Sequence, residues 1–410
     1  MAGLSGLAGC LKNRNSSGSE STSVEVSGKS VTLGGSLSMT GANAEVGEVY
    51  KDVYELTTRK INQEGGFETK DGETYKLELK IRDDEGDAGK SKSIYQQLVS
   101  DGGVDYLIGP FSSSITLPAT AVAKNNGVPI VVGAASSARL YNQGNEWLFG
   151  VNPLNSTYTY GAIELASAKD SGDTKVGLLV KNDVFSQSVA KGAREKLSET
   201  DMDLLYDGVF PSDLADFSTA LTKVKDKDLD VLLLCSHQRH AVLLANQLHT
   251  YQVDLDLAFA AEGAEGKAFK QATGENANYL YTQSTWIKTK NYDDPVYGSS
   301  DEFIDTYQSK YGDDPDQHAA LAATVVETYV EAFRKAGVSN PKEVRDALAN
   351  TDYESLYGHV SFDSKGVIQK DVALMQYQPD KDGDPVEKTV RPKDVSDAKP
   401  VYPTPSWDQR

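Results

Sequence analysis

The chain has 410 residues, of which 60 are acidic and 41 are basic, so its formal net charge is −19. This acidity excludes sequence-independent binding to nucleic acid, which needs clustered Lys and Arg. The length and a hydrophobic content of 39% exclude a disordered chain and allow two or three domains with cores of their own.

The opening segment, "MAGLSGLAGC", ends in residues that resemble a lipobox, the motif after which a lipoprotein signal is cut and its cysteine lipidated. The alternative is a chance match to four small residues. The following stretch, "LKNRNSSGSESTSVEVSGKS", is polar and rich in Ser and Gly, which is typical of a flexible tether. We therefore expect residues 1–30 to be a signal remnant and tether, with a lipid on Cys10 that anchors the protein to the membrane.

From residue 30 onward, strand-like runs alternate with amphipathic helical patterns. The first half of the chain predicts strands at 30–37, 76–84, 104–110 and 128–134, and helices at 46–66, 87–103 and 114–127. Asp87 is the expected N-cap of the second helix. Strands and helices in alternation, joined by short turns, indicate parallel βαβ units in a doubly wound sheet.

The same rhythm restarts after residue 160. It predicts strands at 174–183, 204–210, 229–236 and 255–263, and helices at 161–172, 186–200, 217–228 and 239–252. A long helix at 316–337, a helix at 341–350 and a hairpin-like pair at 358–366 and 367–378 follow. Cys235 lies in an apolar run and is expected to be a buried strand thiol. The sequence therefore predicts two α/β lobes in tandem.

The residues after each strand matter most, because ligands of open α/β sheets sit outside the carboxyl ends of the strands. After the third strand comes "GPFSSS", whose hydroxyls could supply a nucleophile, an anion site or a helix cap. After the fourth strand comes "GAASS", and two such turns side by side would form one wall of a pocket. Glu262 follows the apolar run of the strand predicted at 255–263 and could accept a bond from an ammonium group, or be an exposed loop acid.

The sequence lacks the motifs of the common enzyme classes. "GPFSSS" is not the G-x-S-x-G elbow of the α/β-hydrolases, and a serine nucleophile would need a base oriented by an acid. Neither a P-loop, nor H-E-x-x-H, nor a G-x-G-x-x-G after a strand is present. We therefore expect a protein that is not an enzyme and that carries no cofactor and no metal.

Residues 31 to 377 resemble the leucine/isoleucine/valine-binding protein family, the type I periplasmic substrate-binding proteins of ABC importers. The matching stretches, in chain order, are "GGSLSMTGANAEVGE", "INQEGGF", "IRDDEGDAGKSKSIYQQLVSDGGVDYLIGPFSSS", "GVPIVVGAASS", "KNDVFSQSVAKG", "DFSTAL", "AEG", "FIDTYQSKYGDDPDQHAALAAT" and "YGHVSFDSKG". The resemblance implies an α/β fold of two doubly wound parallel-sheet lobes joined by three crossovers. Lobe I would hold 31–152 and 284–355, lobe II 153–283 and 356–380, and 381–410 would form an extended C-terminal tail.

The resemblance also implies how an amino acid is held between the lobes. Its α-carboxylate goes to Ser113 and to the turn that contains Ala134, Ala135 and Ser136. Its α-ammonium goes to Glu262.

Five further positions complete the expected site. Phe185 matches an aromatic residue of the family, Val46 matches a side chain of the first loop, and Asn155 lies near the family's polar position at the edge of lobe II. His237 and His318 stand where relatives often carry tyrosine. Imidazole keeps a flat face but changes the hydrogen-bond donors and adds a titration near pH ~6.5.

The resemblance implies an extracytoplasmic receptor, at the cell surface or in the periplasm, that delivers its ligand to permease subunits in the membrane. Branched-chain and other aliphatic amino acids are the first expected ligands, and we expect a monomer. A sensor of the same fold, or a receptor for a small amide or urea-like solute, are the alternatives that stay open. The acidic composition suits high salt, where counterions screen self-repulsion, so we also expect a halophilic source.

Overall fold

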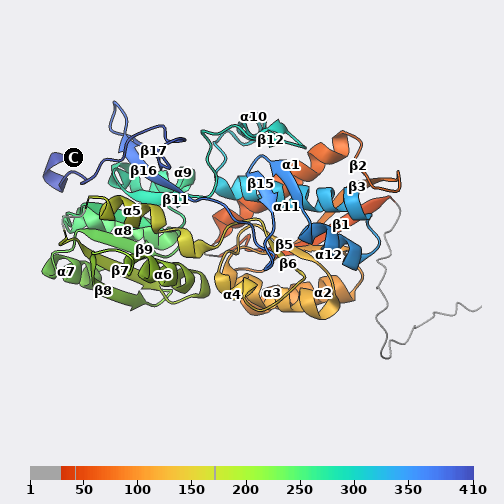
Figure 1. The fold of residues 1–410 in the computed structure, drawn as a ribbon, viewed down its shortest axis with the longest axis horizontal. Helices are drawn as coiled ribbons and strands as arrows, with labels where there is room; N and C mark the ends of the chain where they lie inside the picture. Colours follow the sequence, from red (N-terminus) through yellow and green to blue (C-terminus); the bar gives the residue numbers. More distant parts are fainter. Residues whose placement is uncertain (1–28, 42, 170–171) are drawn as a thin grey trace, which may run out of the picture.

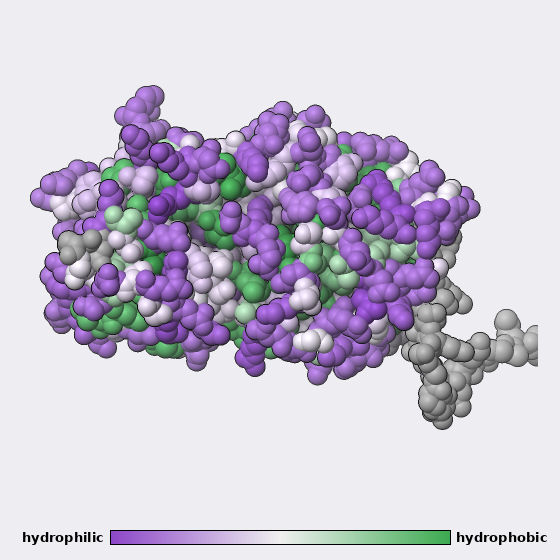
Figure 2. Space-filling model, in the orientation of Figure 1, coloured by the Kyte–Doolittle hydropathy of each residue, from purple (hydrophilic) through white to green (hydrophobic). Residues whose placement is uncertain are grey.

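The computed structural model describes residues 29–41, 43–169 and 172–410, and it has two α/β lobes that lie side by side along the long axis (Figure 1). The first sheet belongs to lobe I and the second to lobe II. Cys10 and the predicted tether lie outside the described residues. Within the described part, no helix combines the length and the apolar character needed to cross a membrane. Figure 2 shows a face dominated by hydrophilic residues, with hydrophobic patches where the two lobes meet.

The lobe I sheet has six strands in the order β2-β3-β1-β4-β5-β6. Its strands are β1 (Ser30–Leu37), β2 (Phe67–Glu68), β3 (Thr74–Asp83), β4 (Tyr106–Ile108), β5 (Ile130–Val132) and β6 (Leu148–Gly150). All pairs are parallel except β2 with β3. Because β3 lies on one side of β1 and β4 on the other, the chain reverses direction across the sheet between β1 and β4. That reversal opens a crevice at the carboxyl ends of these two strands.

Helices cover both faces of this sheet. The lobe I helices are α1 (Ala44–Gln63), α2 (Ala88–Ser100), α3 (Ser113–Asn126), α4 (Ala138–Tyr141), α10 (Ser300–Tyr311), α11 (Gln317–Ala336) and α12 (Pro341–Ala349). On β4, Tyr106 and Ile108 pack in the core with α1 and α11, whereas Leu107 packs in the core with α2 and α3. Side chains of a strand alternate between the two faces of the sheet, so both faces of this short apolar strand are buried. Asp87 caps α2 by accepting the N–H of Lys90 at 2.6 Å, which confirms the predicted cap.

The lobe II sheet repeats the same order in its parallel part, β8-β7-β9-β10-β11, and adds β16 and β17 as antiparallel strands. Its strands are β7 (Lys175–Lys181), β8 (Asp203–Phe210), β9 (Val231–Cys235), β10 (Leu257–Ala260), β11 (Tyr281–Ser284), β16 (Ala373–Pro379) and β17 (Pro385–Arg391). The chain reverses between β7 and β9, so the crevice of this lobe lies at their carboxyl ends.

Five α-helices flank this second sheet: α5 (Tyr160–Ser167), α6 (Val184–Leu197), α7 (Ser218–Asp226), α8 (Gln238–Thr250) and α9 (Gly266–Thr273). Short 3-10 turns lie at Asn155–Thr157, Gly274–Ala277 and Trp407–Gln409. On β9, Val231, Leu233 and Cys235 pack with α5 and α6, and Leu232 and Leu234 pack with α7 and α8. Cys235 is a free, buried thiol as predicted, and burial raises its pKa to about 12.

The chain crosses between the lobes three times, which confirms the predicted fold class. Val151 packs in lobe I and Tyr158 in lobe II, so the first crossing lies between them. The second crossing lies just before Trp286, which is again part of the lobe I core. The third lies after Ile368 of the lobe I core and before Leu374 of the lobe II core.

Two predicted boundaries are wrong. The segment after residue 355 stays in lobe I, because β15 (Gly358–Ser361) pairs with β14 (Asp352–Ser355) and Val360 packs in the lobe I core. The chain therefore enters lobe II near residue 370. The predicted hairpin partner, β16, instead lies between β11 and β17.

The second wrong boundary concerns residues 381–410. This segment is not an extended tail throughout, because β17 pairs with β16 and forms the outermost strand of the lobe II sheet. Farther on, the indole N–H of Trp407 donates to the Val253 carbonyl at 2.9 Å. The C-terminal segment is thus part of lobe II.

Candidate functional site

The crevices of the two sheets face each other across the contact between the lobes. From lobe I come Phe111, in the loop after β4, and His318, in the first turn of α11. From lobe II come His237, directly after β9, and Glu262, directly after β10. The ring of Phe111 lies 5.8 Å from that of His318 and 6.3 Å from that of His237.

A cavity of about 60 Å³ lies between these side chains. Its lining is mostly polar: Asn43, Val46, Phe111, Lys181, Ser212, His237, Gln238, Arg239, His240, Glu262, Gly263 and His318. Four of the predicted site residues, namely Val46, His237, Glu262 and His318, are therefore brought together around one cavity.

The most tightly connected part of this lining is the pair Glu262 and His318. The imidazole Nε2 of His318 lies 2.9 Å from Oε1 of Glu262, and both side chains are more than nine-tenths buried. The other ring nitrogen, Nδ1, lies 3.3 Å from Asp316 and 3.8 Å from Glu265. Gln317 donates to Glu265 at 3.0 Å. Three carboxyl groups therefore surround one imidazole.

The ionisation of this cluster follows from burial and from the charges within it. Burial alone would lower the pKa of His318, but Asp316 and Glu262 outweigh it and raise that pKa well above its usual value. Burial would raise the pKa of Asp316, yet His318 and hydrogen bonds hold it at about 2. Burial and the neighbouring Glu262 raise the pKa of Glu265 well above its usual range. The charges and burial within the cluster therefore favour the protonated forms of His318 and Glu265 and the ionised form of Asp316.

Glu262, Glu265 and His318 also have the composition of a metal site, since one ligand atom from each lies within 4.8 Å of the others. Direct contact between His318 and Glu262 satisfies both groups without an ion.

On the lobe II side, His237 lies at the centre of an aromatic and charged group. Its ring packs on Phe185 with the centroids 4.6 Å apart. Its Nδ1 lies 3.6 Å from Asp183, which is also 2.9 Å from the ammonium of Lys181. Burial lowers the pKa of His237, although Asp183 opposes this. Phe185, which was predicted to contact the ligand, packs on His237 and does not line the cavity.

The remaining predicted site residues are buried next to the cavity and do not line it. Ser113 Oγ accepts the backbone N–H of Ser137 at 3.2 Å, and Ser136 Oγ accepts the hydroxyl of Tyr158 at 3.4 Å. The side-chain amide of Asn155 donates to the Phe185 carbonyl at 3.1 Å. The turn residues Ala134 and Ala135 are 8% and 0% exposed. The helix cap that "GPFSSS" suggested is not formed by the N-cap residue Ser112, whose side chain makes no capping bond in the described part of the chain.

Direct contacts hold the lobes against each other around the cavity. Gln238 of α8 donates to Glu45 of α1 at 2.8 Å. The hydroxyl of Ser137 donates to the Val184 carbonyl at 3.3 Å. Together with the pair of Glu262 and His318, these contacts define a closed arrangement of the lobes.

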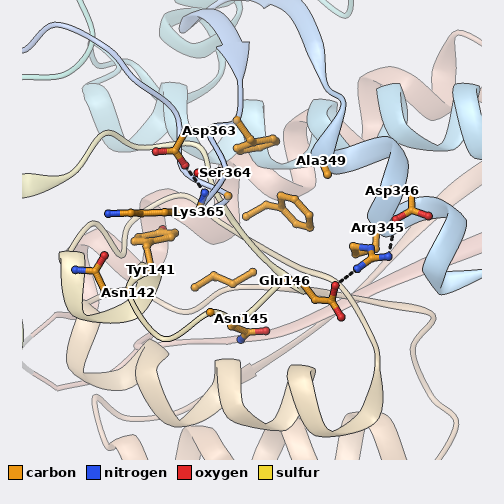
Figure 3. Close-up of a pocket in the computed structure, with 15 residues that line it drawn as sticks. Tyr141, Asn142, Asn145, Glu146, Arg345, Asp346, Ala349, Asp363, Ser364 and Lys365 are labelled. Carbon is orange, nitrogen blue, oxygen red and sulfur yellow. Dashed lines mark hydrogen bonds and ion pairs between the residues drawn. The ribbon is translucent and has the colours of Figure 1, made fainter.

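A larger hollow, of about 710 Å³, lies on lobe I and is lined by α4, α12 and the loop after β15 (Figure 3). Three of its charged groups are paired, since Arg345 contacts Glu146 and lies 2.6 Å from Asp346. Asp363 accepts the backbone N–H of Lys365 at 2.8 Å. It contains none of the predicted site residues, so the interlobe cavity is the candidate site.

A family model described as "Periplasmic binding protein" matches residues 30–384. The chain belongs to the periplasmic binding protein family. Membership implies an extracytoplasmic location and the binding of a small solute. The family of solute-binding proteins that the sequence resembled is thereby confirmed.

Curated relatives and solved structures agree with this membership. The Leu/Ile/Val-binding protein homolog 7 of Brucella suis is 24% identical over an alignment of 340 residues that covers 79% of this chain and 82% of the relative. The branched-chain amino acid transporter substrate-binding protein LivJ of Streptococcus pneumoniae, solved with isoleucine, is 26% identical with a TM-score of 0.76, covering 89% of this chain and 100% of that one. A solute-binding protein of R. palustris, solved with benzoate, has the same fold at 15% identity and a TM-score of 0.74, covering 87% and 95%.

Eight of the twelve lining residues are not among the predicted site residues, and three of these eight bear on the ligand. Phe111 stands in "GPFSSS" itself, where the three hydroxyls are the stronger chemical signal. Lys181 is the last residue of β7 and so lies at a strand end. His240 lies in the first turn of α8, three residues after the N-cap His237, and its ring centroid lies 5.0 Å from that of Phe210.

Proposed function

We propose that the protein is the solute-binding receptor of an ABC importer and that it binds a free amino acid between its lobes. The observation that carries this proposal is Glu262, an acid only 6% exposed that lines the interlobe cavity. The cluster around it holds three carboxyl groups and one imidazole, so it has an excess of acid. An ammonium group donates charge-assisted hydrogen bonds to such an acid and balances its charge.

The predicted carboxylate-binding residues have the chemistry that this role requires. Ser113 Oγ already accepts an N–H from Ser137, and Ser136 Oγ already accepts from Tyr158. A hydroxyl that accepts one bond keeps its own hydrogen free to donate. Ser113 and Ser136 are therefore proposed as donors to the ligand's α-carboxylate, with the turn at Ala134 and Ala135 allowing close approach.

Entry of the ligand requires the lobes to move. The cavity of about 60 Å³ is smaller than the roughly 150 Å³ that holds a benzene molecule in an engineered protein core. The three crossings form a natural hinge, and the contacts between Gln238 and Glu45 and between His318 and Glu262 must break when the cleft opens. A ligand that binds the closed arrangement better would shift the equilibrium toward closure.

A thermal-shift screen of the purified protein against the common amino acids and small amides tests the proposal, because a cleft ligand stabilises the folded state by mass action. Isoleucine and leucine are included because relatives have been solved with them. We expect at least one free amino acid to raise the Tm, and its methyl ester and its N-acetyl derivative to fail. Stabilisation by urea or a simple amide alone would favour the alternative ligand class and contradict the proposal.

We further propose that a lipid on Cys10 holds the receptor at the outer side of the membrane, where it meets its permease as a monomer. Cys10→Ser should release the protein into the soluble extracytoplasmic fraction, and retention on the membrane would contradict the anchor.

The acidic composition supports a halophilic source, so the free energy of unfolding should rise from low to molar KCl. Equal stability at both salt concentrations would contradict that proposal.

A further inference from the structure

The order of strands in lobe II spreads the polar lining residues along one edge of the sheet. The parallel strands follow the order β8, β7, β9, β10. Ser212 comes shortly after β8, Lys181 ends β7, His237 follows β9 and Glu262 follows β10. Neighbouring strands are about 4.8 Å apart, so Lys181 lies two strand spacings, or roughly 10 Å, from Glu262 along this edge.

The part of the cavity away from Glu262 is unsuited to an aliphatic side chain. Besides Gly263, the lining contains only two apolar residues, Val46 and Phe111. His240 is 2% exposed, and its Nε2 has no hydrogen-bond partner among the residues that the structure describes. A hydrocarbon side chain placed here would leave this nitrogen, and the free hydrogens of the Lys181 ammonium, without partners.

We propose that Lys181 and His240 form a subsite for a carboxamide, so that the ligand is an amino acid of the glutamine or asparagine type. This inference rests on the proposed function, because it takes the ligand's ammonium group to lie at Glu262. It differs from the sequence-based expectation of a branched-chain ligand.

The two side chains complement a carboxamide and not a carboxylate. Burial, together with Lys181 and Arg239, lowers the pKa of His240 to about 4, so its imidazole is neutral at pH 7. The Nε2 of His240 has no hydrogen-bond partner among the described residues, so in the neutral ring this nitrogen can serve as an acceptor. The amide N–H₂ donates to that acceptor, and the amide oxygen accepts from Lys181, which keeps donors beyond its 2.9 Å pair with Asp183. A carboxylate would place an oxygen lone pair against the lone pair of His240.

A comparison of dissociation constants distinguishes between the candidate ligands of this cavity. Isothermal titration of the full chain with glutamine, asparagine, glutamate, leucine and isoleucine gives a Kd for each. We expect an amide to bind at least tenfold more tightly than leucine and glutamate, since leaving one buried polar group unpaired costs about a power of ten or more in affinity. Tighter binding of leucine, or of glutamate, would overturn the carboxamide assignment while leaving the proposed function intact. Binding of none of the amino acids would contradict the proposed function itself.

A variant separates the subsite from general effects on the cleft. His240→Leu should weaken binding of the amide about tenfold and leave the Kd for leucine unchanged or lower. His359→Leu is the matched control, because His359 lies on β15 with its side chain 52% exposed and does not line the cavity. Equal weakening of amide and leucine in His240→Leu would overturn the subsite. If that variant fails to fold, Lys181→Met carries the same expectation. The dissociation constants of the wild-type protein test the proposal independently of any variant.

Discussion

The imidazole of His318 and the carboxyl group of Glu262 meet at 2.9 Å across the contact between the two lobes. His318 belongs to α11 of lobe I, and Glu262 follows β10 of lobe II, so the same contact closes the cleft and occupies the proposed ammonium site. A ligand ammonium and the imidazolium would then share one acid. Closure of the lobes and recognition of the ligand are therefore coupled through Glu262. The groups around Glu262 set the strength of this coupling.

Replacing Glu262 by Gln removes the negative charge proposed to face the ligand's ammonium group. A hydrogen bond to a charged group contributes about 1.5 to 3 kcal/mol, so the affinity for the amino acid should fall about 10- to 100-fold. Isothermal titration with the ligand found in the thermal-shift screen measures the change.

Glu265→Gln is the matched control for that experiment. It makes the same substitution in the same cluster, but Glu265 does not line the cavity, and burial and Glu262 raise the pKa of its carboxyl group, which favours the neutral form that Gln mimics. Its Kd should stay within about threefold of the wild-type value. Unchanged affinity in Glu262→Gln, or equal losses in both variants, would refute the role of Glu262.

Asp316→Asn should lower the pKa of His318. Asp316 is the first of the groups that raise that pKa, and its Oδ2 lies 3.3 Å from the ring. A raised imidazole pKa gives stability that is complete below about pH 6.5 and is lost as the pH rises through the folded-state pKa. The contribution should therefore be smaller in the variant and should be lost completely at a lower pH than in the wild type. The ionised carboxylate of Asp316 also stabilises the fold, because its pKa is held at about 2. This contribution is complete above the usual Asp pKa of about 4 and is lost as the pH falls through about 2.

An NMR titration of the imidazole signals follows this pKa directly, with His318→Gln assigning the resonance. Asp313→Asn, three residues earlier in the same loop, is the control and should leave the titration unchanged. A His318 pKa that is the same in Asp316→Asn and in the wild type would show that Asp316 does not hold the imidazole in its charged form.

Most of the fold could be predicted from hydrophobic patterns, because in each lobe the parallel strands are short apolar runs flanked by amphipathic helices. β9 is an example, with all five of its residues buried. The elements that were missed have no such pattern. α10 (Ser300–Tyr311) is polar over most of its length and buries only Ser300, Phe303 and Tyr307. β17 is charged and only half-buried, so nothing in its composition distinguishes it from the extended tail that was expected.

The site could be predicted only in part, for a similar reason. Strand ends located His237 and Glu262, because position after a strand is readable from the sequence. Which face of a helix turns toward the cleft is not readable in that way, so the sequence did not indicate that His240 lines the cavity. Nor could the sequence reveal that the hydroxyls of Ser113 and Ser136 are engaged with Ser137 and Tyr158, since these partners depend on how the turns pack.

Glu45→Ala should weaken ligand binding although Glu45 is not part of the ligand site. Glu45 accepts a bond from Gln238 at 2.8 Å across the cleft, and it does not line the cavity. Its loss removes a contact of the closed arrangement only, so the open arrangement becomes more populated. For an exposed hydrogen bond of about 0.5 to 1.5 kcal/mol, the Kd should rise roughly two- to tenfold. Glu48→Ala, an exposed acid on the same helix, is the control, and an equal effect of both variants would argue against a role in closure.

Gly192→Ala should destabilise the junction between lobe II and the first crossing. A Cβ at Gly192 of α6 would lie 1.8 Å from the backbone oxygen of Ser156, an atom that cannot rotate away. Overpacking of this kind costs about 1 to 3 kcal/mol of the free energy of unfolding. Gly89→Ala in α2 is the matched control, since its nearest neighbour is the side-chain end of Asp87 at 3.2 Å and Ala favours a helix by up to ~1 kcal/mol. Urea unfolding of both variants measures the difference, and equal midpoints would mean that α6 does not pack against this crossing as closely as the structure has it.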